Sequence, residues 1–117
     1  MYYLCRMNIE KQTAQMRKGV LELCILSIID RHDAYASDIL VQLKDAQLIV
    51  VEGTLYPLLT RLKNDGFLNY RWEESKSGPP RKYYVITENG RIMLSRLHSI
   101  WNDLVESVAQ ITEKVKE

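Results

Sequence analysis

The sequence predicts a mainly α-helical fold with one small β-hairpin, an α+β fold. Three observations predict it: a strongly apolar helical segment at residues 15–31, a leucine stripe with helical spacing in residues 53–68, and two short aromatic and β-branched segments around a Gly-Pro turn. The 117 residues, 46% hydrophobic and 26% charged, have the length and balance of one folded domain.

The first two helices are predicted to form the centre of the domain. Residues 15–31 are apolar on nearly every side, which is typical of a buried helix. Ser37 is expected to cap the second helix, because a serine hydroxyl can accept a hydrogen bond from a backbone N–H of the first turn. Ile39, Leu40 and Leu43 then form the inner face of that helix.

A third helix is predicted for residues 53–68. Its leucines recur at i, i+3, i+4 and i+7 and form one core-facing stripe: Leu55, Leu58, Leu59 and Leu62. Pro57 has no N–H to donate, so we expect the helix to begin within one turn of it. Gly66 is expected to end the helix in the left-handed conformation.

Two strands and a last helix complete the predicted order. The segments 67–73 and 81–87 read as strands joined by a protruding loop, residues 74–80, that is too long for a tight hairpin. Thr87 is expected to cap a long helix that runs from about Glu88 almost to the C-terminus. Helix, helix, helix, hairpin, helix is the order of a winged helix-turn-helix domain.

Positive charge is concentrated in the third helix and the loop, although the formal net charge is only +1. Between Thr54 and Lys82 there are six basic and three acidic residues. We predict a DNA-binding face from the outward residues of the helix and the cations of the loop, whose side chains suit phosphates and base edges: Thr54, Tyr56, Thr60, Arg61, Lys63, Asn64, Lys76, Arg81 and Lys82. The alternative for each element is an ordinary solvated surface.

The last helix carries a coiled-coil-like apolar seam, and the simplest partner for it is the same helix of a second subunit. The seam consists of Met93, Leu97, Ile100, Leu104, Val108, Ile111 and Val115. The N-terminal segment, with Tyr3, Leu4, Met7 and Ile9, is a further candidate for this interface. We therefore expect a homodimer, with residues 1–14 packing on the dimer helix, 15–87 forming the DNA-binding domain and 88–117 forming the dimerisation helix.

Other functional classes receive little support from the residues. His32 and His98 have no accompanying nucleophile, phosphate loop or carboxylate pair, so no enzyme is expected and both are read as structural or surface residues. Cys24 is read as a core thiol, and neither it nor Cys5 has zinc-ligand neighbours, so no metal or cofactor is expected. No apolar run spans a membrane and the first residues do not resemble a secretory signal, so a cytoplasmic location is expected.

Several blocks resemble the PadR family of bacterial regulators, over most of residues 17–105. They are Gly53-Thr54-Leu55-Tyr56-Pro57-Leu58-Leu59 with Arg61-Leu62 and Asp65-Gly66, then Gly78-Pro79-Pro80-Arg81-Lys82-Tyr83-Tyr84, then Thr87-Glu88 and Gly90-Arg91. The resemblance implies a dimer whose last helices exchange between subunits. It also implies that Tyr56 and the outward side of the third helix enter the major groove, and that Arg81 and Lys82 lie near the wing.

The short last helix is similar to that of the LmrR-type multidrug-responsive repressors, and this similarity implies a small aromatic or hydrophobic effector. In those proteins a tryptophan of the last helix stacks on flat aromatic compounds, and Trp101, with Leu97 and Ile100 beside it, falls at the matching place. The alternative is that Trp101 packs in the dimer interface.

Two residues depart from the family pattern. Val51 stands where relatives often carry a capping Ser or Thr, so Gly53 or Thr54 is expected to take over the cap, and Ala36 replaces a common glycine. The function predicted overall is a repressor that binds an inverted-repeat operator as a homodimer. The alternative is a winged-helix protein-interaction module without operator binding.

Overall fold

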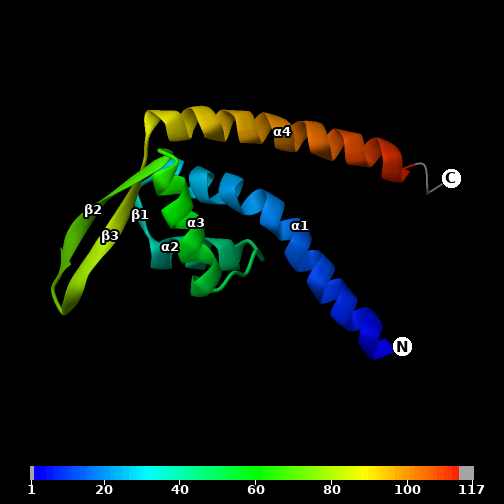
Figure 1. Ribbon diagram of the computed structural model, residues 1–117, viewed down its shortest axis with the longest axis horizontal. Helices are drawn as coiled ribbons and strands as arrows, with labels where there is room; N and C mark the ends of the chain where they lie inside the picture. Colours follow the sequence, from blue (N-terminus) through cyan, green and yellow to red (C-terminus); the bar gives the residue numbers. More distant parts are fainter. Residues whose placement is uncertain (1, 114–117) are drawn as a thin grey trace.

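The computed structural model describes the backbone of residues 2–113 and the side chains of residues 9–113. Its elements are α1 (Tyr2–Arg31), β1 (Ala34–Tyr35), α2 (Ala36–Asp45), α3 (Glu52–Asn64), β2 (Leu68–Ser75), β3 (Gly78–Ile86) and α4 (Glu88–Glu113). The C-terminal part of α1 lies beside the first part of α4 and the two long helices diverge toward the N-terminus, while the β2–β3 hairpin projects away from the helices (Figure 1). The predicted α+β winged-helix fold is confirmed.

Some predicted interface residues cannot be placed. The side chains of Tyr3, Leu4 and Met7, and Val115 at the end of the seam, lie outside the described residues.

Within residues 2–113, no helix has both the length and the hydropathy that a membrane crossing requires.

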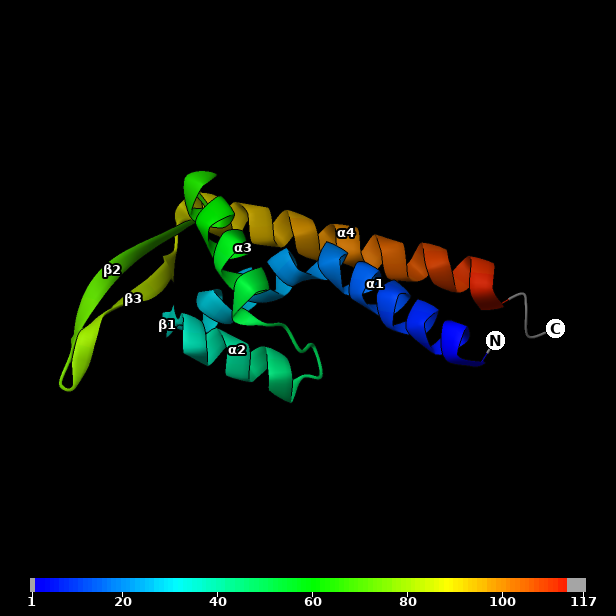
Figure 2. The same ribbon diagram turned by 60° about the horizontal axis from the view of Figure 1, so that its bottom comes forward.

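The core lies where the C-terminal half of α1 meets α2, α3 and the base of the hairpin (Figure 2). Each helix contributes the apolar side predicted from its spacing. The most deeply buried side chains are Ile25, Leu26, Ile29, Ile39, Leu43, Leu55, Leu59, Leu62 and Leu68. Burial of such a side chain contributes about 1.5–3 kcal/mol, so these contacts fix the orientation of α3 relative to the rest of the domain.

The sheet has three antiparallel strands in the order β1-β3-β2, one more than predicted. The extra strand β1 has two residues and pairs only with Tyr83 and Tyr84. The β2–β3 register shifts between Glu73 and Ser75, so Pro79 and Pro80 have no paired residue on β2, and such an irregularity tolerates residues without an N–H. The predicted seven-residue loop is wrong: Ser75 pairs with Gly78, so Lys76 and Ser77 alone form the turn.

The junction between the hairpin and α4 matches its prediction. Thr87 caps α4, because its Oγ1 accepts the Gly90 N–H at 3.0 Å and donates to the Gly66 carbonyl at 2.6 Å. Gly66 has a φ of +86°, the left-handed conformation predicted for the end of α3. Gly90 is buried so tightly that a Cβ there would collide with the Phe67 carbonyl. The start of α4 is thus fixed to the body of the domain.

Three predicted helix starts differ from the structure. The helix predicted from Gln15 already begins at Tyr2. Ser37 is not the cap of α2: the cap position is Tyr35, whose backbone N–H donates to the Asp38 carboxylate at 3.0 Å. Asp38 outcompetes Ser37 because it lies three residues into the helix, where its carboxylate reaches back to the N-cap.

The start of α3 differs as well. The helix begins at Glu52, more than one turn before Pro57, with Val51 at the cap position and no side-chain cap, so neither Gly53 nor Thr54 takes that role. The first helical bonds, from the N–H groups of Thr54 and Leu55, go to the Val51 carbonyl. Pro57 lies in the second turn of α3, where it cannot donate to the Gly53 carbonyl and its ring lies close to that carbonyl.

Candidate nucleic-acid interface

The outer surface of α3 is determined by which side the leucines bury. Leu55 and Leu59 are 0% exposed and hold one side of the helix against the core. Tyr56, Thr60 and Lys63 recur at i, i+4 and i+7 and form one exposed flank of α3. This flank faces the β2–β3 hairpin, which is the wing of the domain.

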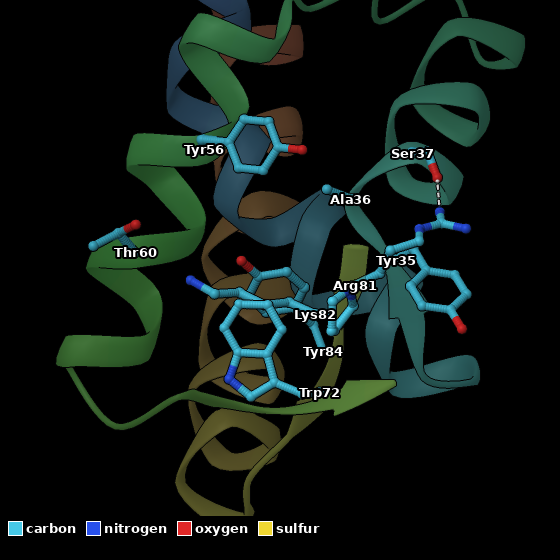
Figure 3. Close-up of a pocket in the computed structure, with 10 residues that line it drawn as sticks. Tyr35, Ala36, Ser37, Tyr56, Thr60, Trp72, Arg81, Lys82 and Tyr84 are labelled. Carbon is cyan, nitrogen blue, oxygen red and sulfur yellow. Dashed lines mark hydrogen bonds between the residues drawn. The ribbon is translucent and has the colours of Figure 1, made fainter. Parts of the chain in front are cut away.

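A groove lies between this flank of α3, the start of α2 and the wing (Figure 3). Its volume is about 350 Å³. Four predicted DNA-binding residues line it: Tyr56, Thr60, Arg81 and Lys82. The groove also includes residues that the sequence did not single out, namely Tyr35, Ala36, Ser37, Trp72, Pro80 and Tyr84. Hydroxyl, ammonium, guanidinium and aromatic groups thus share one concave surface.

Arg81 is held in place on the α2 side of the groove. Its guanidinium carbon lies 3.8 Å from the centroid of the Tyr35 ring. One of its terminal nitrogens donates a hydrogen bond of 2.6 Å to the Ser37 hydroxyl, the bond drawn in Figure 3. Guanidinium groups bind aromatic faces electrostatically. The wing cation is therefore already oriented without any ligand.

Tyr35 is itself fixed by polar and aromatic neighbours. Its hydroxyl donates to the Glu73 carboxylate at 3.5 Å, and its ring meets Tyr83 edge to face at a centroid distance of 4.7 Å. Burial raises the pKa of the Tyr35 phenol and the Glu73 carboxylate raises it further. The phenol therefore remains a neutral hydrogen-bond donor at neutral pH.

Arg71 supports the same region from β2. It forms ion pairs with Asp33 at 3.3 Å and with Glu73 at 3.2 Å, and its guanidinium carbon lies 4.5 Å from the centroid of the Tyr83 ring. Asp33 belongs to the segment between α1 and β1, so these contacts connect the wing to the body of the domain.

Lys82 lies on an aromatic surface of the wing. Its Nζ is 4.5 Å from the centroid of the Tyr70 ring and 5.5 Å from that of Trp72, its cross-strand partner. Lys63 of α3 approaches the same Tyr70 ring at 5.8 Å. Trp72 is 61% exposed, which is high for a residue of its size. Lys82 and the exposed Trp72 indole thus line the groove from the wing, whereas Lys63 of α3 lies against the Tyr70 ring and is not part of the groove lining.

The remaining predicted DNA-binding residues do not line the groove. Arg61 lies on the opposite flank of α3 and forms an ion pair with Glu22 of α1. Thr54 shares that flank, seven residues before Arg61. Asn64 is exposed at the end of α3, and Lys76 is exposed in the turn of the wing. The predicted set is therefore divided between several parts of one exterior surface.

The groove residues that the sequence did not single out could have been found only in part. Trp72 alternates with Tyr70 on one face of β2, a signal of an aromatic strand face that was visible in the sequence. Tyr35 and Ser37 reach the groove only because β1 pairs with β3, and a two-residue strand leaves no periodic signal.

The predicted effector and dimer residues lie on α4. Trp101 lines a cavity of about 330 Å³ together with residues of α1 and of the segment after α2, among them Leu23, Cys24, Ile28 and Leu48. Leu97 packs on the core of its own chain and Ile100 is exposed, and neither lines this cavity. Burial raises the pKa of the Cys24 thiol, so the thiol is protonated at neutral pH.

The outer side of α4 is apolar and exposed in the single chain. Met93 and Leu97 are partly buried against the core, but the later seam residues are exposed: Ile100, Leu104, Val108 and Ile111, with exposed fractions of 53% to 74%. An exposed apolar helix face of this kind is typical of a surface that associates with another protein surface.

Comparisons with known proteins agree with this architecture. The family model described as the transcriptional regulator PadR-like family matches residues 25–96. A PadR-like transcription factor structure from Bacteroides fragilis is 56% identical, covers 86% of this chain and 98% of its own, and has a TM-score of 0.73. A PadR family transcriptional regulator from Eggerthella lenta is 30% identical, covers 95% and 97%, and has a TM-score of 0.88.

A PadR-like transcriptional regulator from Bacillus cereus is similar as well, with 35% identity, coverage of 84% of this chain and 96% of its own, and a TM-score of 0.73. The family match spans the end of α1, all of α2 and α3, the whole wing and the first part of α4. This chain belongs to the PadR-like family of transcriptional regulators.

Proposed function

We propose that this protein is a repressor that binds an inverted-repeat operator as a homodimer. The observation that carries the proposal is the groove in which Tyr56 and Thr60 of α3 face Arg81 and Lys82 of the wing. A helix with exposed polar side chains beside a cationic hairpin offers base contacts from one element and phosphate contacts from the other. The small formal net charge does not oppose this, because Arg81 and Lys82 lie together on that surface.

The dimer is supported by the exposed apolar side of α4. Pairing through Ile100, Leu104, Val108 and Ile111 would remove these side chains from water, which favours association. A two-fold dimer would present two copies of α3, and operator binding requires these copies to be about 34 Å apart, one turn of DNA. Occupancy of the operator would then repress transcription.

An effector is proposed for the cavity beside Trp101. The cavity walls are largely apolar, the indole offers a flat stacking surface, and the site joins α1 to α4. A compound bound there would favour one packing of α4 on α1. Because α4 also forms the proposed dimer interface, such a change would alter the separation of the two α3 helices and release the operator.

The direct test is a footprinting titration of the purified protein on DNA from upstream of its own gene at moderate salt. We expect two protected half-sites one helical turn apart, and loss of protection when planar aromatic compounds are added. Protection without half-site symmetry would contradict the dimer proposal. A soluble dimer that protects no DNA would favour the alternative, a winged-helix module for protein contacts.

A further inference from the structure

Gly53 lies in the first turn of α3, where nothing inside the described chain requires a glycine. A Cβ at this position would meet no atom within 4 Å beyond the adjacent turns of its own helix. Among the glycines, only Gly66 has a positive φ. Glycine weakens a helix relative to alanine because it loses more backbone freedom on folding. Packing within the described chain therefore does not explain the glycine, whose backbone is left open to an approaching molecule.

Pro57 gives the Gly53 backbone a second unusual property. Residue 57 would normally donate its N–H to the carbonyl of residue 53, but proline has no N–H. The Gly53 carbonyl therefore lacks its regular helical donor. Both residues are exposed and lie four positions apart, on the side of α3 opposite the buried Leu55 and Leu59. An acceptor that lacks its helical donor thus lies on the outermost side of this helix, beside the Pro57 ring and on a residue without a side chain of its own.

The charges around this carbonyl indicate what it can bind. Glu52 is exposed beside it, and no basic side chain occurs between Val51 and Thr60. Free N–H groups at a helix start attract anions, but the Glu52 carboxylate in the first turn already compensates for them. Two acceptors and no cation disfavour a phosphate and favour a hydrogen-bond donor. In the major groove such donors are the amino groups of adenine and cytosine, whereas guanine presents only acceptors.

We propose that Gly53 is a base-specificity position. Its carbonyl accepts a hydrogen bond from the exocyclic amino group of an adenine or cytosine, and the absence of a side chain lets the base edge come close enough. This inference rests on the proposed operator binding and adds the class of base that the start of α3 recognises. A guanine at the contacted position would place acceptor against acceptor and would be disfavoured.

The first experiment compares Gly53→Ala with Gly19→Ala. Gly19 is also exposed, lies within α1, and has no atom within 4 Å of an added Cβ, so it is a matched control. Each substitution is expected to raise the melting temperature by about 2–4 °C, since alanine restricts the unfolded chain. Only Gly53→Ala should weaken operator binding, by about tenfold, because its methyl group holds the base edge away.

The second experiment identifies the base through its amino group. Operator duplexes carry purine in place of each adenine, or 2-pyrimidinone in place of each cytosine, one position at a time. At one position in each half-site, the missing amino group should weaken binding of the parent about fivefold or more. The same duplexes should not further weaken binding of Gly53→Ala. They should also not further weaken Pro57→Ala, in which residue 57 regains an N–H for the Gly53 carbonyl.

The outcomes separate this inference from the proposed function. If the parent binds its operator and Gly53→Ala binds equally well, the inference is wrong and the proposed function stands. An equal loss of affinity in Gly19→Ala, or no amino-sensitive position in the parent, would overturn it too. If the parent selects no DNA sequence at all, the proposed function fails and this inference fails with it.

Discussion

Arg81 of the wing and Tyr35 before α2 form a cation–π contact, with 3.8 Å between the guanidinium carbon and the ring centroid. This contact, together with the bond from Arg81 to Ser37, connects the wing to the start of α2. The orientation of the wing cation thus depends on residues outside the hairpin.

Replacement of Tyr35 by leucine should therefore weaken operator binding although Tyr35 itself carries no charge. Loss of the ring removes a contact of about 0.5–1 kcal/mol, so we expect affinity to fall about two- to fivefold. Fluorescence anisotropy with labelled operator measures this change. Tyr35→Phe retains the ring and should bind like the parent. Equal affinity of Tyr35→Leu and the parent would show that Arg81 needs no support from Tyr35.

The ion pair between Arg61 and Glu22 predicts that one substitution strengthens operator binding, whereas loss of the Tyr35 ring weakens it. Arg61 must give up part of this pair to reach a phosphate, so Glu22→Gln should tighten operator binding. Arg61→Ala should weaken it and reduce the number of released counterions by about one. Operator titrations at several salt concentrations measure both the affinity and the number of released counterions.

A double-mutant cycle provides the control for this pair. Glu22→Gln should give no gain in affinity when Arg61 is already alanine, because its effect acts through Arg61. The same gain in both backgrounds would mean that Glu22 repels DNA directly. An unchanged affinity and salt dependence in Arg61→Ala would remove Arg61 from the proposed interface.

Gly90 predicts a large loss of stability from a single methyl group. A Cβ at this position collides with the backbone carbonyl of Phe67, which a side-chain rotation cannot relieve. We expect Gly90→Ala to lower the free energy of unfolding by about 1–3 kcal/mol. Urea unfolding, monitored by circular dichroism, measures this change in the free energy of unfolding. Gly19→Ala is the control and should not destabilise. A Gly90→Ala protein as stable as the parent would contradict the packing described for the start of α4.

The apolar side of α4 predicts the effect of a charge in its middle. Leu104 is 53% exposed in the single chain. If it is covered in the dimer, Leu104→Glu should bury a carboxylate and shift the protein to monomer. Ser99→Glu, on the opposite side of the same helix, should remain dimeric. Light scattering after gel filtration gives the masses, and a Leu104→Glu dimer of unchanged stability would exclude this seam as the interface.

The fold could be predicted largely because its elements carry strong local signals. The leucine spacing of α3, the glycine at position 66 and the Thr87 cap each follow from local physical chemistry. The N-terminal half of α1 was missed because its described side chains are mostly exposed and show no periodic apolar side. The tight turn was missed because Pro79 and Pro80 were read as turn residues, although they belong to β3, at the point where its register with β2 shifts.

The candidate site could be predicted only where it depends on the side a helix buries. The positions of Tyr56 and Thr60 follow from the leucine stripe of α3. The roles of Glu22 and Tyr35 depend on contacts with residues distant in the sequence, Arg61 and Arg81. No local pattern determines such contacts, because they arise only when the core brings α1, α2, α3 and the wing together.

The central claim, that α3 and the wing bind DNA as one surface, is tested most directly by the salt dependence of operator binding in Lys82→Ala. Lys18→Ala removes the same charge from an exposed position of α1 outside the proposed DNA and dimer contacts and is the matched control. We predict weaker binding and a slope lower by about 0.9 in the logarithmic salt plot for Lys82→Ala, with no change for Lys18→Ala. Identical affinities and slopes for the parent and both variants would contradict it.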